Sequence, residues 1–129
     1  MISRRKEESK RKERLGKRED FQRLLSEGKR FHSDQYSLII LRNDLNYMRS
    51  ALSIKKSIGN AVSRNYEKRL CREFFRGEFF RGEFFRREII GEKKGYDVLI
   101  IIKDRSENYR KSFDALYKLF QRFEIFSKL

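Results

Sequence analysis

An unbroken aliphatic run near the C-terminal end of the chain limits the folds that are open to it. Five consecutive residues, Val98 to Ile102, are Val, Leu or Ile. A strand with apolar residues on both of its sides is buried on both faces of its sheet. The run is also far shorter than the roughly 20 apolar residues that a membrane-spanning helix needs. We therefore expect a small sheet that is built around a strand at residues 97–102.

Apolar spacing before and after this run predicts the other elements. In chain order they are a helix at residues 18–27, strands at 30–33, 36–41 and 49–54, a helix at 60–74, the strand at 97–102 and a helix around 113–123. Turn-forming residues at 43–46 indicate that the strands on either side of them form a hairpin. The order predicts an α+β domain with a small mixed sheet of about four strands and three helices, packed against one face of the sheet.

The charge of the chain indicates a polyanionic partner. Lys and Arg number 33 against 19 Asp and Glu, which gives a formal net charge of +14. Such an imbalance repels itself unless a polyanion neutralises it, and nucleic acid is the leading candidate. Residues 3–18 are almost entirely polar and mostly basic. We interpret residues 1–17 as a flexible basic arm and residues 18–129 as a single RNA-binding domain.

The scarcity of histidine and cysteine argues against an active site in the protein itself. His32 is the only histidine and Cys71 the only cysteine, so the chain offers neither a His-based metal cluster nor a catalytic His pair. No apolar segment resembles a signal peptide or a membrane span. We expect a reducing, cytoplasmic location without a membrane partner, and we interpret Cys71 as a packing residue.

The predicted helix at 60–74 has two halves of different character on a helical wheel. The polar half holds Asn60, Arg64, Asn65, Lys68, Arg69 and Arg72. The apolar half holds Val62, Tyr66, Leu70 and Phe74. Lys55 and Lys56 precede the helix, where free backbone N–H groups also bind anions. Any surface helix carries cations on its solvated side, but the charge of the whole chain favours an RNA-binding face.

The segment from Lys55 to Arg72, which reads KKSIGNAVSRNYEKRLCR, resembles the RNR signature of ribonuclease P proteins. The similarity extends over residues 16–123. It implies a ribonuclease P protein-like fold and a protein subunit that binds the catalytic RNA and the 5′ leader of precursor tRNA, assisting endonucleolytic removal of the leader. In that family the RNA subunit and its Mg²⁺ ions carry out catalysis, so the resemblance implies no catalytic residue and no metal site in the protein. DNA is not an expected partner.

The resemblance also assigns residues to two RNA contacts. The expected contacts with the catalytic RNA are Lys55, Lys56, Asn60, Arg64, Asn65, Lys68, Arg69 and Arg72. The expected contacts with the 5′ leader, in a cleft between the first helix and the sheet, are Lys17, Arg18, Phe21 and Tyr36. Core packing is the alternative for Phe21 and Tyr36, because aromatic residues at amphipathic spacing are usually buried. The chain departs from the family pattern at Tyr66, where Arg is usual, and at Leu25, where a second aromatic is frequent.

A five-residue repeat follows the signature and occupies residues 73–87 in three copies of the form EFFRG, the last ending in two arginines. On a helix each copy is rotated by about 140° from the one before, so the Phe pairs cannot share one face. We interpret two of the copies as a local insertion that extends or frays the helix end. Two other functions stay open: a structural RNA-binding protein of ribosomal type and an autonomous nuclease.

Overall fold

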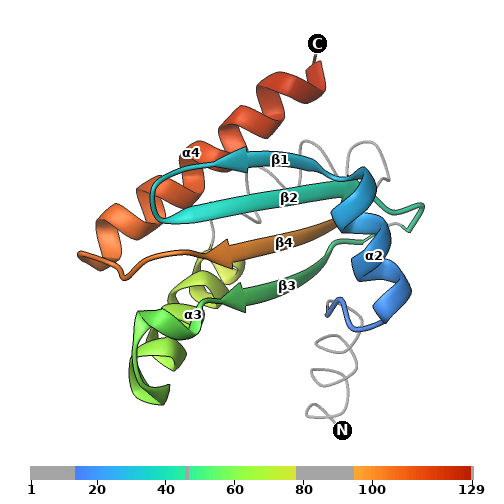
Figure 1. Ribbon diagram of the computed structural model, residues 1–129. Helices are drawn as coiled ribbons and strands as arrows, with labels where there is room; N and C mark the ends of the chain where they lie inside the picture. Colours follow the sequence, from blue (N-terminus) through green and yellow to red (C-terminus); the bar gives the residue numbers. More distant parts are fainter. Residues whose placement is uncertain (1–13, 46, 78–94, 129) are drawn as a thin grey trace, which may run out of the picture.

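The computed structural model describes residues 14–45, 47–77 and 95–128. Its elements, labelled in Figure 1, are α2 (Arg18–Glu27), β1 (Lys29–His32), β2 (Tyr36–Arg42), β3 (Arg49–Ile54), the 3₁₀-helix η1 (Lys56–Ile58), α3 (Ala61–Arg76), β4 (Tyr96–Ile102) and α4 (Tyr109–Lys128). The four strands form one mixed sheet, which confirms the predicted α+β class. No helix in the described part of the chain is long and apolar enough to cross a membrane.

The strand order of the sheet is β1-β2-β4-β3. β2 is antiparallel to both β1 and β4, whereas β3 runs parallel to β4. The predicted strand at 30–33 is confirmed as β1, and it forms a hairpin with β2. The predicted hairpin of β2 and β3 is wrong, because β4 lies between these strands. The turn-forming segment contacts the start of β4 instead: the Asn43 N–H donates to the carbonyl oxygen of Gly95 at 3.1 Å, and the Gly95 N–H donates to that of Leu45 at 2.7 Å.

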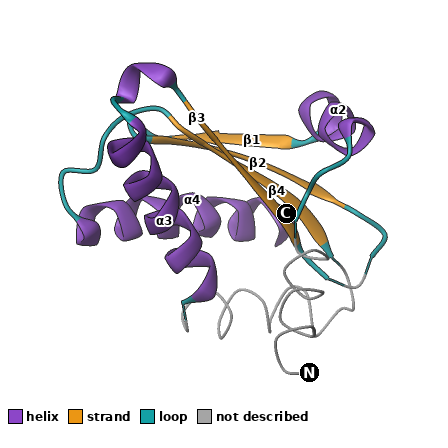
Figure 2. Ribbon diagram, turned by 90° about the horizontal axis from the view of Figure 1, so that it is seen from below, coloured by secondary structure: helices purple, strands orange, loops and turns teal. Residues whose placement is uncertain are grey.

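The connection from β3 through α3 to β4 is left-handed. In Figure 1 both strands run to the left, with β4 above β3, and α3 lies behind the sheet. Figure 2 shows α3 and α4 together on one side of the sheet and α2 on the other. Parallel neighbouring strands are joined by right-handed crossovers in nearly all proteins. The hand of this connection is therefore a distinctive feature of the fold.

The helices cover both faces of the sheet. Leu38 and Ile40 of β2 belong to a core that β2 shares with α3 and α4, whereas Ile39 packs on the other face with Leu24 of α2. The expectation that all three helices pack on one face is therefore wrong for α2. The run at residues 98–102 lies in a central strand whose successive residues enter the cores on both sides, as its continuous apolar character predicted.

The larger core lies between the sheet and the pair of helices α3 and α4. Phe74 of α3 stacks on Phe120 of α4, with ring centroids 5.7 Å apart and 21° between the ring planes. Phe74 and Phe75 are the aromatic pair of the first repeat copy, and both are buried. α3 ends at Arg76 and Gly77 is its C-cap, so the first copy closes this helix. The second and third copies lie outside the described residues.

The chain joins the domain earlier than predicted. Leu15 is buried in the core on the α2 side, and its N–H donates to the carbonyl oxygen of Ser50 at 3.0 Å. Arg14 also pairs with Ser50 in an isolated parallel bridge. The predicted boundary after residue 17 is therefore too late, because Arg14 and Leu15 already pair with Ser50 of β3. The rest of the predicted arm, residues 1–13, lies outside the described part of the chain.

Candidate nucleic-acid interface

The rotation of α3 differs from the prediction. Its buried side consists of Glu67, Leu70, Cys71, Phe74 and Phe75. Val62 is 77% exposed and Tyr66 is 42% exposed, so their assignment to the buried half of the helix is wrong. Asn65, Arg69 and Arg72 are exposed, as the wheel predicted. The solvent-facing side of α3 is therefore a mixture of aliphatic, aromatic and cationic groups.

Arg64 and Lys68 lie at the border between the two sides of α3 and are half-buried. The Nε of Arg64 is enclosed and has no hydrogen-bond partner among the described residues. A buried donor without an acceptor costs about 1–3 kcal/mol, and more for a charged group. The guanidinium of Arg64 is therefore partly desolvated, and an anion that reached it would be bound more strongly than by a fully hydrated cation.

Asn60 starts α3. Its Oδ1 accepts a hydrogen bond from the backbone N–H of Ser63 at 3.0 Å, which makes it the N-cap of the helix. Caps of this kind typically stabilise a protein by about 1 kcal/mol. The cap uses Oδ1 of Asn60 and leaves its amide NH₂ group available for the predicted RNA contact. Asn60 is a structural residue of the signature as well as a candidate contact.

A buried carboxylate fixes the rotation of α3. Glu67 is 4% exposed, and it accepts hydrogen bonds from the backbone N–H of Ser106 at 2.9 Å and from the Ser106 hydroxyl. A buried carboxylate needs such partners, because the effective penalty for burying an ion is several kcal/mol. These bonds tie α3 to the loop between β4 and α4. With Glu67 turned inward, Tyr66 and Val62 face solvent.

Tyr36 is a core residue, which is one of the two alternatives that the sequence left open. Its side chain is fully buried on the α3 and α4 side of the sheet, and its hydroxyl accepts a hydrogen bond from Gln35 Nε2 at 3.0 Å. Burial raises its pKa above the ordinary range, and burial also raises the pKa of the neighbouring Cys71 thiol to about 12. Phe21 lies on the opposite face of the sheet. The prediction that Tyr36 shares a leader cleft with Phe21 is therefore wrong.

A residue that sequence reasoning missed lies beside the start of α3. Arg105, in the loop after β4, is exposed and donates from its Nε to the carbonyl oxygen of Ile58. The guanidinium of Arg105 lies against Gly59, and a Cβ at that position would collide with it. Gly59 also has a φ of 150°, a backbone conformation that favours glycine. Arg105 thus adds a cation next to the exposed Lys55 and Lys56. No motif marks it, because the contact joins segments far apart in the sequence.

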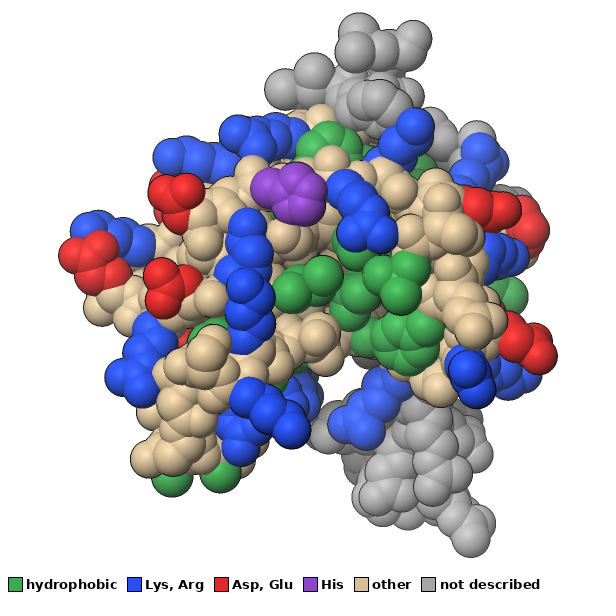
Figure 3. Space-filling view, viewed as in Figure 1, with side chains coloured by type: hydrophobic (Ala, Val, Ile, Leu, Met, Phe, Trp, Pro, Cys, Tyr) green, Lys and Arg blue, Asp and Glu red, His purple; other side chains and the backbone are tan. Residues whose placement is uncertain are grey.

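The face of the sheet beside α2 presents a second surface, which we call the α2-face surface. Its apolar part consists of the partly buried side chains of Phe21, Leu41, Ala51 and Ile101. Figure 3 shows hydrophobic side chains gathered on this face, with Lys and Arg side chains around them. Lys17 and Arg18 are exposed at the start of α2. Three of the four predicted leader contacts, Lys17, Arg18 and Phe21, therefore belong to α2 and the residue before it.

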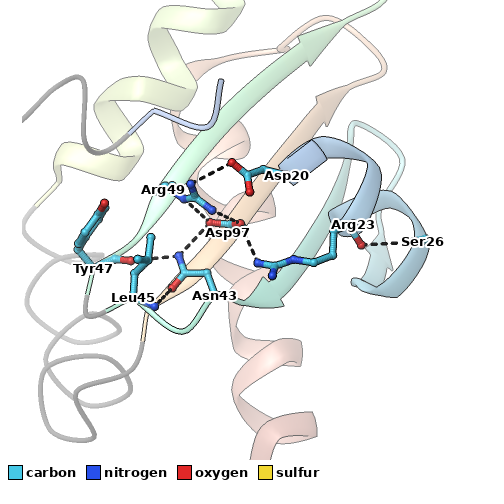
Figure 4. Close-up of polar contacts among 8 residues, drawn as sticks. All are labelled: Asp20, Arg23, Ser26, Asn43, Leu45, Tyr47, Arg49 and Asp97. Atoms are coloured by element: carbon cyan, nitrogen blue, oxygen red, sulfur yellow. Dashed lines mark hydrogen bonds and ion pairs between the residues drawn. The ribbon is translucent and has the colours of Figure 1, made fainter. Parts of the chain in front are cut away.

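A network of charged side chains fixes α2 over the sheet (Figure 4). Arg49 of β3 donates to both carboxylate oxygens of Asp97, from Nε and from Nη2, each at 2.8 Å. Its Nη1 donates to Asp20 of α2 at 3.1 Å, and Arg23 of α2 lies 3.9 Å from Asp97. The hydrogen bonds to Asp97 raise the pKa of Arg49. Asn43 Nδ2 completes the set by donating to Asp97 at 2.9 Å. The network holds α2 in a fixed position beside the α2-face surface.

Together these features define a small, strongly basic α+β protein with two surfaces on opposite sides of one sheet. The outward side of α3 is rich in cations, and the α2-face surface is apolar with basic groups around it. Among residues 14–45, 47–77 and 95–128, no group of three or more His, Cys, Asp or Glu side chains is placed to hold a metal ion. A protein of this class is suited to binding a polyanion.

The family model for ribonuclease P matches residues 9–124. The chain belongs to the ribonuclease P protein family. Membership implies a role as the protein component of a ribonucleoprotein endoribonuclease that has an RNA partner.

Individual relatives agree with this assignment. The ribonuclease P protein component of Dictyoglomus turgidum is 30% identical over 120 residues, which cover 90% of this chain and 92% of that protein. The component of Thermotoga maritima is 31% identical over 102 residues, which cover 78% of this chain and 79% of that protein. The match to the component of Syntrophus aciditrophicus is 42% identical over 67 residues, covering 52% of this chain and spanning 56% of that protein's length.

Solved structures show the same fold. The RNase P protein of Staphylococcus aureus matches with a TM-score of 0.69 at 24% identity, covering 88% of this chain and 97% of the other. The RNase P protein of Thermotoga maritima matches with a TM-score of 0.56 at 26% identity, covering 86% of this chain and 94% of the other.

Proposed function

We propose that this chain binds the catalytic RNA of ribonuclease P through the outward side of α3, and the 5′ leader of precursor tRNA through the α2-face surface. It thereby assists the endonucleolytic removal of the leader in the cytoplasm. The observation that carries the proposal is the exposure of Asn65, Arg69 and Arg72 on the helix that bears the RNR-like sequence. Exposed guanidinium groups on a packed helix are preorganised donors for phosphate oxygens.

The cations at the start of α3 extend this proposed contact. Lys55 and Lys56 precede the helix, and Arg105 adds a third cation from another part of the chain. Each phosphate that such a cation neutralises releases counterions, so binding strengthens as salt is lowered. The contact with the catalytic RNA is therefore expected to be strong at low salt and to weaken steeply as salt is raised.

The α2-face surface has the chemistry that a single-stranded leader requires. Phe21 supplies an aromatic ring, and a base that stacks on such a ring gains about 1–3 kcal/mol whatever its identity. Lys17 and Arg18 supply cations that bind phosphates without reading sequence. This tolerance suits a processing enzyme whose precursors carry different leaders.

The proposed division of labour leaves the chemistry to the RNA. Hydrolysis of the phosphodiester bond, giving a 5′-phosphate on mature tRNA, would belong to the RNA subunit and its Mg²⁺ ions. The cations of the protein would relieve the repulsion between the two RNAs. Contacts with the leader, which the product lacks, would make the complex bind precursor better than mature tRNA.

A reconstitution experiment tests this function. The full chain is mixed with a bacterial ribonuclease P RNA at low Mg²⁺, and the 5′ cleavage of precursor tRNA is measured beside the RNA alone and the protein alone. We expect cleavage only when both components are present, because the cations of the protein replace part of the Mg²⁺ requirement. The complex should also bind precursor with a leader more tightly than the same tRNA without one.

Two results would overturn the proposal. Cleavage by the protein alone would identify an autonomous nuclease. Equal binding of tRNA with and without a leader, together with no effect on cleavage, would identify a structural RNA-binding protein.

A further inference from the structure

The outward side of α3 carries exposed apolar side chains that the fold does not use. Tyr66 is 42% exposed, and Val62, one turn earlier, is 77% exposed. The large hydrophobic residues that are exposed in the described part of the chain are Leu25, Val62, Tyr66 and Tyr109. Two of these four thus lie on one stripe of a single helix. Arg69 continues the stripe, with 67% of its side chain exposed.

Tyr66 and Arg69 are in contact. The Cζ of Arg69 lies 5.8 Å from the centroid of the Tyr66 ring, within the range of a cation–π interaction. The other charged contact of Arg69, to Glu73 at 3.9 Å, joins two exposed side chains, and such pairs contribute little. The guanidinium thus lies beside the ring, and the two flat groups are neighbours on the helix surface.

An aromatic ring beside a guanidinium is the combination on which unpaired nucleobases stack. The surrounding charge favours the same ligand, because Arg72 and Arg76 are also exposed on α3 and the chain carries a net charge of +14. Like charge repels a second copy of this chain and attracts a polyanion. We propose that Tyr66 and Arg69 form a stacking site for an unpaired base of the catalytic RNA.

This inference rests on the proposed function and adds a ligand class to it. Where the RNR-like sequence usually has Arg, this chain has Tyr66. The exchange removes a cation that would bind phosphate and supplies a ring that binds a base. At this position the affinity should therefore depend on stacking, and it should respond little to salt.

Affinity measurements on the full chain separate stacking from charge. The dissociation constant for a bacterial ribonuclease P RNA is measured at several salt concentrations for Tyr66→Ala, Tyr66→Phe and Arg69→Gln. We expect Tyr66→Ala to weaken binding about 5- to 150-fold, which corresponds to the roughly 1–3 kcal/mol of one base–aromatic stack, with an unchanged salt slope. Tyr66→Phe should recover most of the lost affinity. Arg69→Gln should weaken binding and also lower the salt slope by about 0.7, because it removes a cation together with the flat group beside the ring.

Tyr109→Ala is the matched control for loss of an exposed tyrosine. Tyr109 is 52% exposed on α4, where its ring contacts Phe113. Its replacement should leave the affinity for the RNA within about twofold of wild type, because a surface side chain away from the interface contributes little. Equal affinities of Tyr66→Ala and wild type would overturn the stacking site, as would a loss in Tyr66→Ala that Tyr66→Phe does not recover.

A fluorescence measurement gives a second readout. The chain contains no tryptophan, so Tyr66→Trp and Tyr109→Trp each introduce a single tryptophan, whose emission can be excited separately from that of the tyrosines. Stacking on a base should quench the emission of Tyr66→Trp when the RNA is added, and that of Tyr109→Trp should change much less. Equal changes at both positions would contradict the proposal. A change in the oligomeric state of the free protein on Tyr66→Ala would instead identify this stripe as a self-association surface.

Comparison of wild type with Tyr66→Ala distinguishes failure of the stacking site from failure of the proposed function. If wild-type protein neither binds the RNA nor supports cleavage, the proposed function fails. If wild type does both and Tyr66→Ala binds equally well, only the stacking site fails.

Discussion

At the scale of single residues, Asp97 shows how one buried charge can determine the position of a whole helix. Its side chain is fully buried, and it accepts two hydrogen bonds from Arg49 and one from Asn43. Arg49 also reaches Asp20 of α2. Burial of an ion is unfavourable unless its partners are well placed. The fold meets this condition by drawing β3, α2 and the loop after β2 to a single carboxylate.

Replacement of Asp97 by Asn should therefore destabilise the protein strongly. Asn removes the negative charge and places an NH₂ group against the donors of Arg49 or Asn43, and breaking a buried pair in this way typically costs about 3–5 kcal/mol. The free energy of unfolding can be measured by urea denaturation. Glu107→Gln is the control, because it removes an exposed ion pair with Lys111, whose expected contribution is below about 1 kcal/mol. Equal losses in the two variants would show that the Asp97 network does not stabilise the fold.

The signature residues also show what a motif can and cannot predict. The exposure of Arg69, Arg72 and Asn65 followed from the pattern, because alternation of polar and apolar positions fixes most of a helix face. The outward position of Tyr66 did not follow. It depends on Glu67, which is buried only because Ser106, on a distant loop, donates two hydrogen bonds to it. The wheel centred the buried side on the apolar residues Val62, Tyr66, Leu70 and Phe74, and it could not count a carboxylate as part of that side. It therefore predicted the wrong rotation of α3.

At the scale of elements, the segment between β2 and β3 has turn chemistry but does not form a hairpin. The backbone groups of Asn43 and Leu45 form hydrogen bonds with the backbone of Gly95 instead, just before β4 begins. Local sequence revealed the turn-forming residues and the bounds of both strands, since these depend on local preferences. It did not reveal that β4 inserts between them, because pairing between strands far apart in the sequence leaves no local signal.

Gly95 is the point at which this arrangement is most sensitive to substitution. A Cβ at this position would collide with the carbonyl oxygen of Tyr47 and would lie 2.8 Å from that of Leu45. Gly95→Ala should therefore destabilise the protein by about 1–3 kcal/mol, the usual range for overpacking. The loss can be read from the midpoint of urea unfolding.

Gly16→Ala is the matched control for this prediction. A Cβ at Gly16 meets no atom within 4 Å, so its effect should be close to zero or slightly stabilising. If both alanine variants unfold at the same urea concentration, the close approach at Gly95 does not constrain the fold.

At the scale of the whole molecule, the central strand determines the layout. Its continuous apolar run predicted burial on both faces, and burial on both faces requires a helix on each. The predicted placement of all three helices on one face was nevertheless wrong for α2, because local patterns do not reveal the ion pairs of Arg49 with Asp20 and Asp97 that hold α2 on the other face. The family resemblance implied one cleft for Tyr36 and Phe21, although the sheet separates them. Alternation along β2 places Ile39, and not Tyr36, on the face of α2.

Because the two proposed RNA surfaces lie on opposite faces of a rigid sheet, variants in them should act independently. Arg72→Gln should weaken assembly with the catalytic RNA without changing the preference for precursor with a leader once the complex is saturated. Phe21→Ala should reduce that preference, by up to the roughly 1–3 kcal/mol of one stacked base, with little effect on assembly. In the double variant both losses should appear in full, because distant sites add to within about 0.5 kcal/mol. The affinity for the catalytic RNA and the preference for precursor with a leader are both measured in binding titrations, with catalytic RNA and with matched tRNAs.

A loss of leader preference in Arg72→Gln would show that the two surfaces form a single site. An assembly defect in Phe21→Ala as large as that of Arg72→Gln would show the same.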